Sequence, residues 1–232
     1  MTEEFEIYLY ISPSEFGIYL LNTRELKNLY ENKHNFKKEN NKINLIILNE
    51  FLEDNIFKIE KLIGRFVKNI YLIIENDQIM KINLCVQKKN YEQYFNKGNL
   101  QNLLIEAKDL FKESYQQYKI MHMVINKFII DGNYYSKFSS DLKSKEFILE
   151  IEFLAASNDL IIKIDEVLKK YQIKSIKHLS KFYLQNIFSP EDTKLSIQAH
   201  KILKGYNDNE VLVVSKKLKI QGFFEKFFQL FS

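Results

Sequence analysis

The chain has 232 residues, of which 46% are hydrophobic and 14% aromatic, a composition that indicates a folded protein rather than a disordered one. Its formal net charge of +4 is small, and its lysines are interleaved with acids, which argues against nucleic-acid binding. The single cysteine, Cys85, excludes an intrachain disulfide framework, and its place in an alternating run predicts a buried thiol. We expect no signal peptide, because the N-terminus is acidic, and no spanning helix, because no window of about 18 uncharged apolar residues occurs.

Alternating apolar residues predict strands, and apolar residues three and four apart predict helices. One stripe, which includes Leu48, Leu62 and Phe66, predicts a helix over 48–67. Ser189 as N-cap with Pro190 behind it predicts a later helix that ends at Gly205. Together the elements form a mixed-sheet α/β architecture. In chain order we expect strands at 5–11 and 16–21, a short strand or helix within 22–42, the helix at 48–67, strands at 69–74 and 79–86, a helix at 100–118, strands at 120–130 and 147–155, a helix at 158–170, a strand at 173–179, helices at 181–188 and 189–203, and a strand or extended arm at 209–214.

Residues that could carry chemistry are few and scattered. No Gly-rich phosphate loop and no His or Cys pair with metal-ligand spacing occurs, so we expect no cofactor, no metal and no catalytic residue. His122 lies on a predicted strand and is interpreted as a structural histidine. Glu150 and Glu152 share one strand face and could in principle act as acid and base, although an edge or solvent-facing position is the simpler explanation. Asp131, directly before a glycine, is interpreted as a turn former.

The C-terminal segment combines an aromatic stripe with basic residues. Its apolar residues recur at the period of an α-helix, about 3.6 residues. A short helix of this kind, preceded by lysines, is typical of a segment that lies in a membrane interface. The alternative is a helix that packs on its own domain. We predict that the membrane-binding residues are Phe223, Phe224, Phe227, Phe228, Leu230 and Phe231, with Lys216, Lys217, Lys219 and Lys226 beside them.

The stretch from 121 to 132 resembles a segment of the bacterial cell-division protein FtsA. His122, Phe128, Ile130, Asp131 and Gly132 keep the residue type and spacing of that family, whereas residues 125–127 depart from its Pro-Gln-Glu core. The resemblance implies an actin-like fold whose first domain carries an inserted strand-helix-strand-strand subdomain. It also implies a tether that links the division polymer FtsZ to the inner membrane through a C-terminal amphipathic helix.

The departures from the family concern its nucleotide site. Tyr10 stands where the family's first phosphate loop has an aspartate, and Ser12 stands where it has a glycine. The second phosphate loop has no counterpart, and the sequence stops after what would be the first half of an actin fold. The resemblance therefore implies a shortened relative that binds no nucleotide, and its link to FtsZ is open because that contact belongs to the other half.

These observations lead to one interpretation and two alternatives. We expect half of an actin-like (ribonuclease-H-like) domain in 1–84 and 155–204, the inserted subdomain in 85–154, and a linker with the membrane-targeting tail in 205–232. The expected function is a non-enzymatic, FtsA-like tether or adaptor of the divisome. It would be cytoplasmic and peripheral on the inner membrane, bound to anionic lipid, to division proteins such as an FtsZ-like polymer, and to copies of itself. The alternatives are a soluble, nucleotide-independent module whose tail docks on a partner protein, and an enzyme of unrecognised type.

Overall fold

The computed structural model describes residues 4–38, 41–94, 96–138, 143–189 and 193–211. The chain divides into two units: unit 1 holds residues 1–79 and 157–206, and unit 2 holds residues 80–156 and 207–232. Unit 2 is thus inserted into unit 1, and the chain returns to unit 2 after Tyr206. The sequence predicts domain boundaries after residues 84, 154 and 204, and these boundaries stay predictions. None of the helices in the described part of the chain has the length and hydropathy that a bilayer crossing requires.

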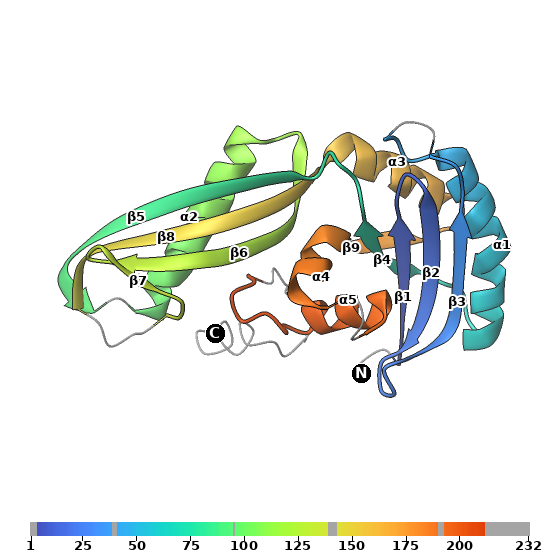
Figure 1. Ribbon diagram of the computed structural model, residues 1–232, viewed down its shortest axis with the longest axis horizontal. Helices are drawn as coiled ribbons and strands as arrows, with labels where there is room; N and C mark the ends of the chain where they lie inside the picture. The colour runs from blue at the N-terminus through green and yellow to red at the C-terminus, as the bar shows by residue number, and fades with distance from the viewer. Residues whose placement is uncertain (1–3, 39–40, 95, 139–142, 190–192, 212–232) are drawn as a thin grey trace. The chain divides into compact units, whose positions relative to one another are not determined.

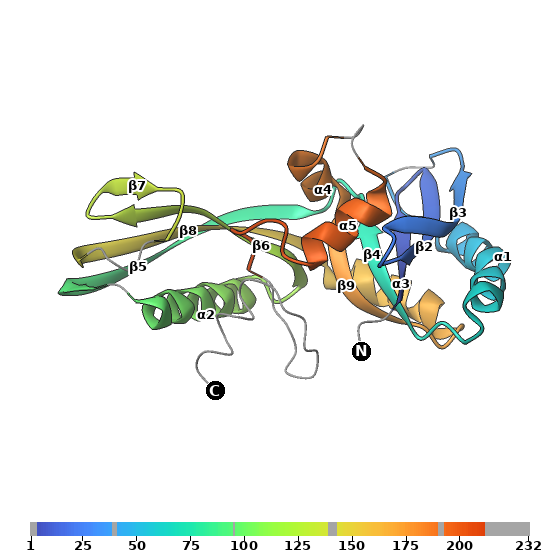
Figure 2. The same ribbon diagram turned by 90° about the horizontal axis from the view of Figure 1, so that it is seen from below.

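Unit 1 is built on a five-stranded mixed sheet with the order β3-β2-β1-β4-β9. The hairpin strands are antiparallel, whereas β1 pairs in parallel with β4, and β4 with β9. Figures 1 and 2 show α1 and α3 on one face of this sheet and α4 and α5 on the other. The strands and helices are β1 (Phe5–Ile11), β2 (Glu15–Asn22), β3 (Lys27–Asn35), α1 (Leu45–Ile63), β4 (Asn69–Ile74), α3 (Asn158–Lys169), β9 (Lys174–Ser180), α4 (Lys181–Ile187) and α5 (Leu195–Leu203).

Burial along the hairpin follows from this two-sided cover. β1 and β2 are buried at nearly every position, as expected for strands with helices on both faces. The edge strand β3 instead alternates between exposed and half-buried residues. The segment 22–42 therefore contains a strand, and the helix alternative for it is wrong.

The helix α1 begins and ends earlier than the sequence predicts. Asn44 caps its first turn by accepting the N–H groups of Ile46 and Ile47, and Gly64 ends it with a left-handed φ of 67°. The predicted extension to residue 67 is wrong because the left-handed residue breaks the helical period. Phe66 therefore leaves the predicted apolar stripe and is 79% exposed, and Leu62 in the last turn is 57% exposed.

The helix predicted from Ser189 is also wrong at its start. α5 begins at Leu195, its N-cap is Lys194, and no side chain caps it, while Ser189 lies exposed outside the helix. A Ser-Pro pair fits an extended segment as well as a helix start, since proline disfavours the helical conformation of the residue before it. Pro190 itself lies outside the described residues.

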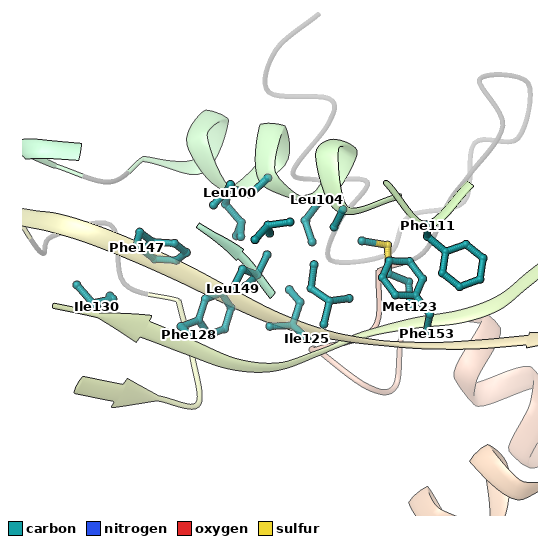
Figure 3. Packing of buried hydrophobic residues seen from close by; sticks show 14 of the residues in the cluster. Leu100, Leu104, Phe111, Met123, Ile125, Phe128, Ile130, Phe147, Leu149 and Phe153 are labelled. Carbon is teal, nitrogen blue, oxygen red and sulfur yellow. The ribbon is translucent and has the colours of Figure 1, made fainter. Parts of the chain in front are cut away.

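Unit 2 is a four-stranded sheet, ordered β5-β8-β6-β7, with α2 along one face (Figure 2). Its elements are β5 (Met80–Tyr94), α2 (Lys97–Ser114), β6 (Tyr118–Ile130), β7 (Asn133–Tyr135) and β8 (Lys143–Ser157). Strand, helix, strand and strand follow in the order predicted for the insert, with the short β7 added to β6. Figure 3 shows the core between helix and sheet, where Phe111 stacks on Phe153 at 4.7 Å between ring centroids. The two rings are fully buried, as are Phe147, Leu149 and Ala107 nearby.

The opposite face of this sheet is polar. The alternation in β5 places Val86 in the core, so Cys85 points away from it and is exposed. The predicted buried thiol is therefore wrong. Glu152 lies 2.6 Å from Lys81 and Glu150 lies 3.6 Å from Lys127, all on this outer face.

After α5 the chain adds a short strand-like segment to β6. The backbone N–H of Ile125 donates to Asn209, and that of Val211 donates to Met123, both at 2.8 Å. Between them, Glu210 forms an antiparallel bridge with Val124. We call residues 207–211 the strap. The extended arm predicted at 209–214 is thus present as far as the structure describes it.

Candidate functional site

The carboxyl ends of β1, β4 and β9 lie together at one end of the unit 1 sheet. Ile11 pairs with Ile74, and Ile74 pairs with Ser180, so the three parallel strands end level with one another. In open sheets of this kind, ligands bind beyond the carboxyl ends of the strands, where the chain leaves neighbouring strands toward opposite sides. This end is therefore the place to look for a nucleotide or another small ligand.

Three side chains from the three strand ends close on one another at this end. Tyr10 is the penultimate residue of β1, Glu75 directly follows β4, and Lys181 directly follows β9. The Tyr10 hydroxyl donates a hydrogen bond to Glu75 Oε2. Lys181 Nζ donates to the Tyr10 oxygen at 2.9 Å and to Glu75 Oε2 at 2.7 Å, and it lies 4.7 Å from the centre of the Tyr10 ring. The three groups thus satisfy one another, and we call them the Tyr10 cluster.

The electrostatics of the Tyr10 cluster fix its protonation. Burial raises the pKa of Tyr10 to about 12, helped by the bond to Glu75 and opposed by Lys181. Burial also disfavours the charged forms of Glu75 and Lys181, but their hydrogen bonds and charges prevail, so the pKa of Glu75 is lowered and that of Lys181 is raised. Near neutral pH the cluster is therefore a carboxylate, an ammonium and a neutral phenol. A general acid or base needs a pKa near the working pH, so none of these groups is poised for proton transfer.

The turn between β1 and β2 is closed by Ser12. Its Oγ accepts the backbone N–H groups of Ser14 at 3.3 Å and Glu15 at 2.8 Å, and donates to the Glu15 carbonyl at 3.0 Å. The backbone N–H of Ser12 itself donates to Glu15 O at 3.0 Å. Pro13 has no N–H to offer. Every backbone donor of residues 12–15 is thus used inside the turn, whereas a phosphate loop needs such donors free to bind the anion.

A second buried polar group, around Glu6 of β1, joins the sheet to α5. Glu6 Oε2 lies 2.7 Å from His200 Nδ1 and accepts the Tyr8 hydroxyl at 2.5 Å, and Lys204 Nζ lies 3.3 Å from Oε1. Burial raises the pKa of Glu6, but the hydrogen bonds of His200 and Tyr8 and the charges of His200 and Lys204 outweigh it and lower the pKa overall. Both Glu6 and His200 are buried, so this group is structural.

A serine, histidine and aspartate also meet in unit 1 without forming a catalytic triad. Ser175 Oγ donates to Asp165 Oδ1 at 2.5 Å, and it lies 3.0 Å from His178 Nε2. The serine therefore stands between the other two, whereas a triad needs the histidine between acid and nucleophile. Since the one hydroxyl proton is held by Asp165, His178 does not serve as its base. Among the described residues no group of three or more His, Cys, Asp or Glu could hold a metal ion.

The candidate residues named from the sequence do not form one site, because each contacts a different partner. His122 Nδ1 lies 2.8 Å from Glu210 Oε1, with 0% and 5% of the two side chains exposed, which confirms the structural interpretation of this histidine. The carboxylates of Glu150 and Glu152 form ion pairs with Lys127 and Lys81 on the outer face of the unit 2 sheet.

Asp131 is confirmed as a turn residue, with φ of 47° before Gly132 at 81°. Its Oδ1 also accepts the N–H groups of Lys145 and Glu146, which ties the turn to β8.

The predicted tail residues, Phe223, Phe224, Phe227, Phe228, Leu230, Phe231, Lys216, Lys217, Lys219 and Lys226, all lie outside the described residues. Sequence reasoning singled out Tyr10 and Ser12 but missed Glu75 and Lys181. The one available signal was their place in the predicted order: Glu75 directly follows the strand predicted at 69–74, and Lys181 begins the helix predicted after the strand at 173–179.

Comparisons with known proteins identify the fold. The sequence matches no protein-family model and has no significant match among curated proteins. Among solved structures, the chain is similar to the PilM–PilN type IV pilus biogenesis complex, with a TM-score of 0.50, 11% identity, and coverage of 77% of this chain and 48% of that one. It also matches the cytoplasmic domain of EpsL, an inner-membrane component of the type II secretion system of Vibrio cholerae, with a TM-score of 0.41, 8% identity, and coverage of 81% and 60%.

A third similar structure, from Bacteroides thetaiotaomicron, is described as having an actin-like ATPase fold and unknown function. Its TM-score is 0.32 at 12% identity, with coverage of 80% of this chain and 56% of that one. The chain thus spans about half the length of the structures it resembles. The predicted actin-like α/β class with its inserted subdomain is confirmed. The C-terminal helix of that prediction lies outside the described residues, and the finer resemblance to FtsA stays a prediction. The chain has an actin-like α/β fold that carries an inserted subdomain.

Proposed function

We propose that this protein is a non-enzymatic, nucleotide-independent adaptor that holds a membrane-associated assembly machinery at the inner membrane through its C-terminal Phe-rich tail. The machinery we favour is the divisome, because the 121–132 stretch resembles FtsA. The similar structure, the PilM–PilN complex of type IV pilus biogenesis, is likewise a complex of proteins. The protein would be cytoplasmic and peripheral on the membrane, with division proteins or copies of itself as partners.

The observation that carries the nucleotide-independent part is the closed turn at the end of β1. Ser12 occupies the backbone donors that a phosphate would need. The Tyr10 cluster fills the adjacent strand ends with a carboxylate already neutralised by Lys181. A carboxylate held in this way is a poor ligand for the magnesium that accompanies nucleotides, since Mg²⁺ requires free oxygen ligands in near-octahedral geometry.

The membrane part of the proposal rests on the tail sequence. A fully buried Phe side chain contributes roughly 1.5–3 kcal/mol, but burial in a lipid interface is partial, and ordering a short helix costs entropy. A single tail therefore gives weak, reversible binding. Self-association or a multivalent partner would raise the avidity, which fits a component of an assembly better than a lone anchor.

Localisation in cells tests the tether. A fluorescent fusion of the full chain should outline the membrane, and a Phe227→Glu/Phe228→Glu variant should be diffuse because two charges interrupt the apolar stripe. A Gln229→Glu variant, which adds a charge on the polar face, is the matched control and should stay at the membrane. A diffuse signal for the unmodified chain, unchanged by the double substitution, would rule the tether out.

Calorimetry tests the loss of nucleotide binding. We expect no heat of binding when ATP and magnesium are titrated into the protein. A Ser12→Gly variant, which releases the N–H groups of Ser14 and Glu15, is the informative comparison. Micromolar affinity for ATP in the unmodified protein would refute the claim that this site is closed.

The alternative is a soluble module whose tail docks on a partner protein. It predicts that the purified chain does not float with anionic vesicles, while the tail substitutions still abolish its function in cells. Flotation of the unmodified chain, lost in the Phe227→Glu/Phe228→Glu variant, favours the lipid tether instead.

A further inference from the structure

The two edges of the unit 2 sheet differ in how they are covered (Figure 1). On the side of β6, β7 pairs with residues 128–130 and the strap bridges to Val124. On the other side, β5 is the last strand of the sheet and pairs with β8 alone among the described strands. The outer backbone groups of β5 therefore meet no other strand in the described part of the chain, and an edge of this kind can accept one.

The open edge of β5 is regular and carries little charge. From Met80 to Lys89, β5 pairs with β8 residue for residue, without a bulge. Natural edge strands are usually protected by a proline, a bulge or charged side chains. Residues 80–87 contain no proline, and their one charged residue, Lys81, has its Nζ 2.6 Å from Glu152 Oε2. A second strand can therefore approach this segment without burying an unpaired charge.

The core of unit 2 is open at this edge. Met80, Ile82 and Leu84 pack against the core, yet each is only half-buried. The next core-facing residue, Val86, is 3% exposed. A side chain inside a sheet is flanked by residues of the strands on both sides. The missing neighbour of β5 therefore leaves the three half-buried side chains partly uncovered.

Helix α2 adds an apolar side chain to the same edge. Lys88 Nζ donates to Asn99 Oδ1 at 3.0 Å, so the flank of α2 that carries Asn99 faces β5. Leu110 follows Asn99 by about three turns of 3.6 residues, which places it on the same flank, and it is 43% exposed. Helix and strand thus both present apolar groups along one edge of unit 2.

We propose that β5 is a self-association surface, at which the β5 strands of two copies pair antiparallel about a twofold axis at Asn83. The two unit 2 sheets then form one continuous sheet. Because the axis is perpendicular to this sheet, the two α2 helices lie on the same face, with their Leu110 flanks toward each other. The inference deepens the proposed function and rests on it in one respect, that copies of the protein associate. A dimer presents two tails and so raises their avidity.

The sequence of β5 is complementary to itself in this register. With the axis at Asn83, Ile82 lies opposite Leu84 of the second copy, and Met80 lies opposite Val86 of the second copy. The half-buried side chains of each strand therefore cover those of the other, and apolar pairs directly opposite each other stabilise a sheet. The twofold axis repeats every such pair, as in other interfaces between identical subunits.

The lysines of β5 favour the same register. Lys81 lies opposite Cys85 of the second copy, an exposed and uncharged side chain. Lys88 and Lys89 lie beyond the paired segment 80–86. If the strands paired about Cys85 instead, Lys81 would lie opposite Lys89, and like charges directly opposite each other are destabilising.

Cross-linking at the axis tests the register. In the full chain with Cys85→Ser, Asn83→Cys places the introduced thiols of two copies directly opposite, with Cα atoms about 4.5–5.5 Å apart, a spacing that a disulfide spans. Gln87→Cys in the same background is the matched control, because it is exposed on the same face. Its counterpart in the dimer is about 26 Å away, at roughly 3.3 Å per residue. Mild oxidation should give a covalent dimer with Asn83→Cys and none with Gln87→Cys.

Charge pairing tests the axis without a covalent bond. Asn83→Lys and Asn83→Asp each place two like charges opposite one another, so each chain alone should dimerise about fivefold more weakly in sedimentation equilibrium. An equal mixture should associate about fivefold more tightly than the unmodified chain, because opposite charges then meet. Gln87→Lys should leave the association unchanged. Since Asn83 and Gln87 are exposed, folding should be retained, which circular dichroism checks.

Every chain is also prepared with Phe227→Ser/Phe228→Ser, which separates this interface from the proposed tether. Dimerisation should be the same in both tail backgrounds. A chain that dimerises but does not bind anionic vesicles would refute the tether and leave the interface standing. A chain that stays monomeric at every concentration, with and without anionic vesicles, would overturn the interface and leave the tether standing. Equal cross-linking of the two cysteine variants, or dimerisation that is insensitive to the charge at residue 83, would also overturn the interface.

Discussion

Replacing Glu210 by alanine should release the strap from unit 2. Glu210 and His122 form a buried pair at 2.8 Å, with at most 5% of either side chain exposed. Removing one partner of a buried ion pair typically costs about 3–5 kcal/mol, and about 1–3 kcal/mol if the histidine is neutral and only loses its hydrogen-bond acceptor. Because the strap is otherwise fastened to β6 by few contacts, the loss should appear there first.

Amide hydrogen exchange measures this local opening. The N–H of Ile125 donates to Asn209 of the strap, so it becomes free to exchange when the strap leaves. A loss of about 3 kcal/mol should accelerate its exchange by roughly a hundredfold. Glu210→Gln separates the two charge states: it should cost little if His122 is neutral, because the amide oxygen still accepts, and much more if the histidine is charged.

Glu152→Ala is the matched control in the same sheet. It removes the partially exposed pair with Lys81, which should be worth only about 0.2–1 kcal/mol, and Ile125 should exchange as in the unmodified protein. If Glu210→Ala leaves the Ile125 amide fully protected, the pair does not hold the strap, and the reasoning from its burial is refuted.

Two further predictions concern the two cores. The pKa of Glu6 is lowered in the folded protein, so its contribution to stability is present above the unfolded pKa near 4.5 and is lost as the pH falls through the folded pKa. Glu6→Gln should therefore flatten the acid limb of a plot of unfolding free energy against pH. An unchanged acid limb would contradict the stabilising role of this carboxylate. Phe111→Ala should destabilise unit 2 by about 3–5 kcal/mol, because it opens a cavity beside Phe153 at the centre of the core. Urea denaturation measures it, with the exposed Leu110→Ala as the control.

The elements of this protein could be predicted largely from local pattern. The continuous apolar run of β4 and the apolar stripe of α2 leave little choice of strand or helix. The errors came where local rules compete. The alternating run predicts a buried Cys85, but Val86 takes the core face, and neighbouring residues of a strand point to opposite faces, so Cys85 is exposed. Ser189 and Pro190 resemble a helix start, but the same residues suit an extended connection.

The Tyr10 cluster could not be predicted because its three residues are far apart in sequence. Tyr10 and Glu75 are separated by 65 positions, and Tyr10 and Lys181 by 171. The sequence could show that Tyr10 replaces the aspartate expected in the first phosphate loop, which indicates the loss of a nucleotide site. It could not show that Lys181 and Glu75 complete a neutral cluster in its place. The same limit holds for His122, whose structural interpretation was right but whose partner, Glu210, lies 88 positions away.

The strap is the segment through which the folded units connect to the tail. A peripheral tether transmits force from the membrane to the first folded contact that the chain makes, so that contact must hold more tightly than the tail binds lipid. Val211 is the last described residue, and it is fastened to Met123 by its backbone and packs against the core of unit 2. The adjacent buried pair of Glu210 and His122 strengthens this contact, by about 3–5 kcal/mol if the histidine is charged. If the strap opened more easily than the tail leaves the bilayer, the tether would act on unit 1 through α5 instead. The Glu210→Ala variant distinguishes these routes, since it should leave vesicle binding intact while it uncouples unit 2 from the tail.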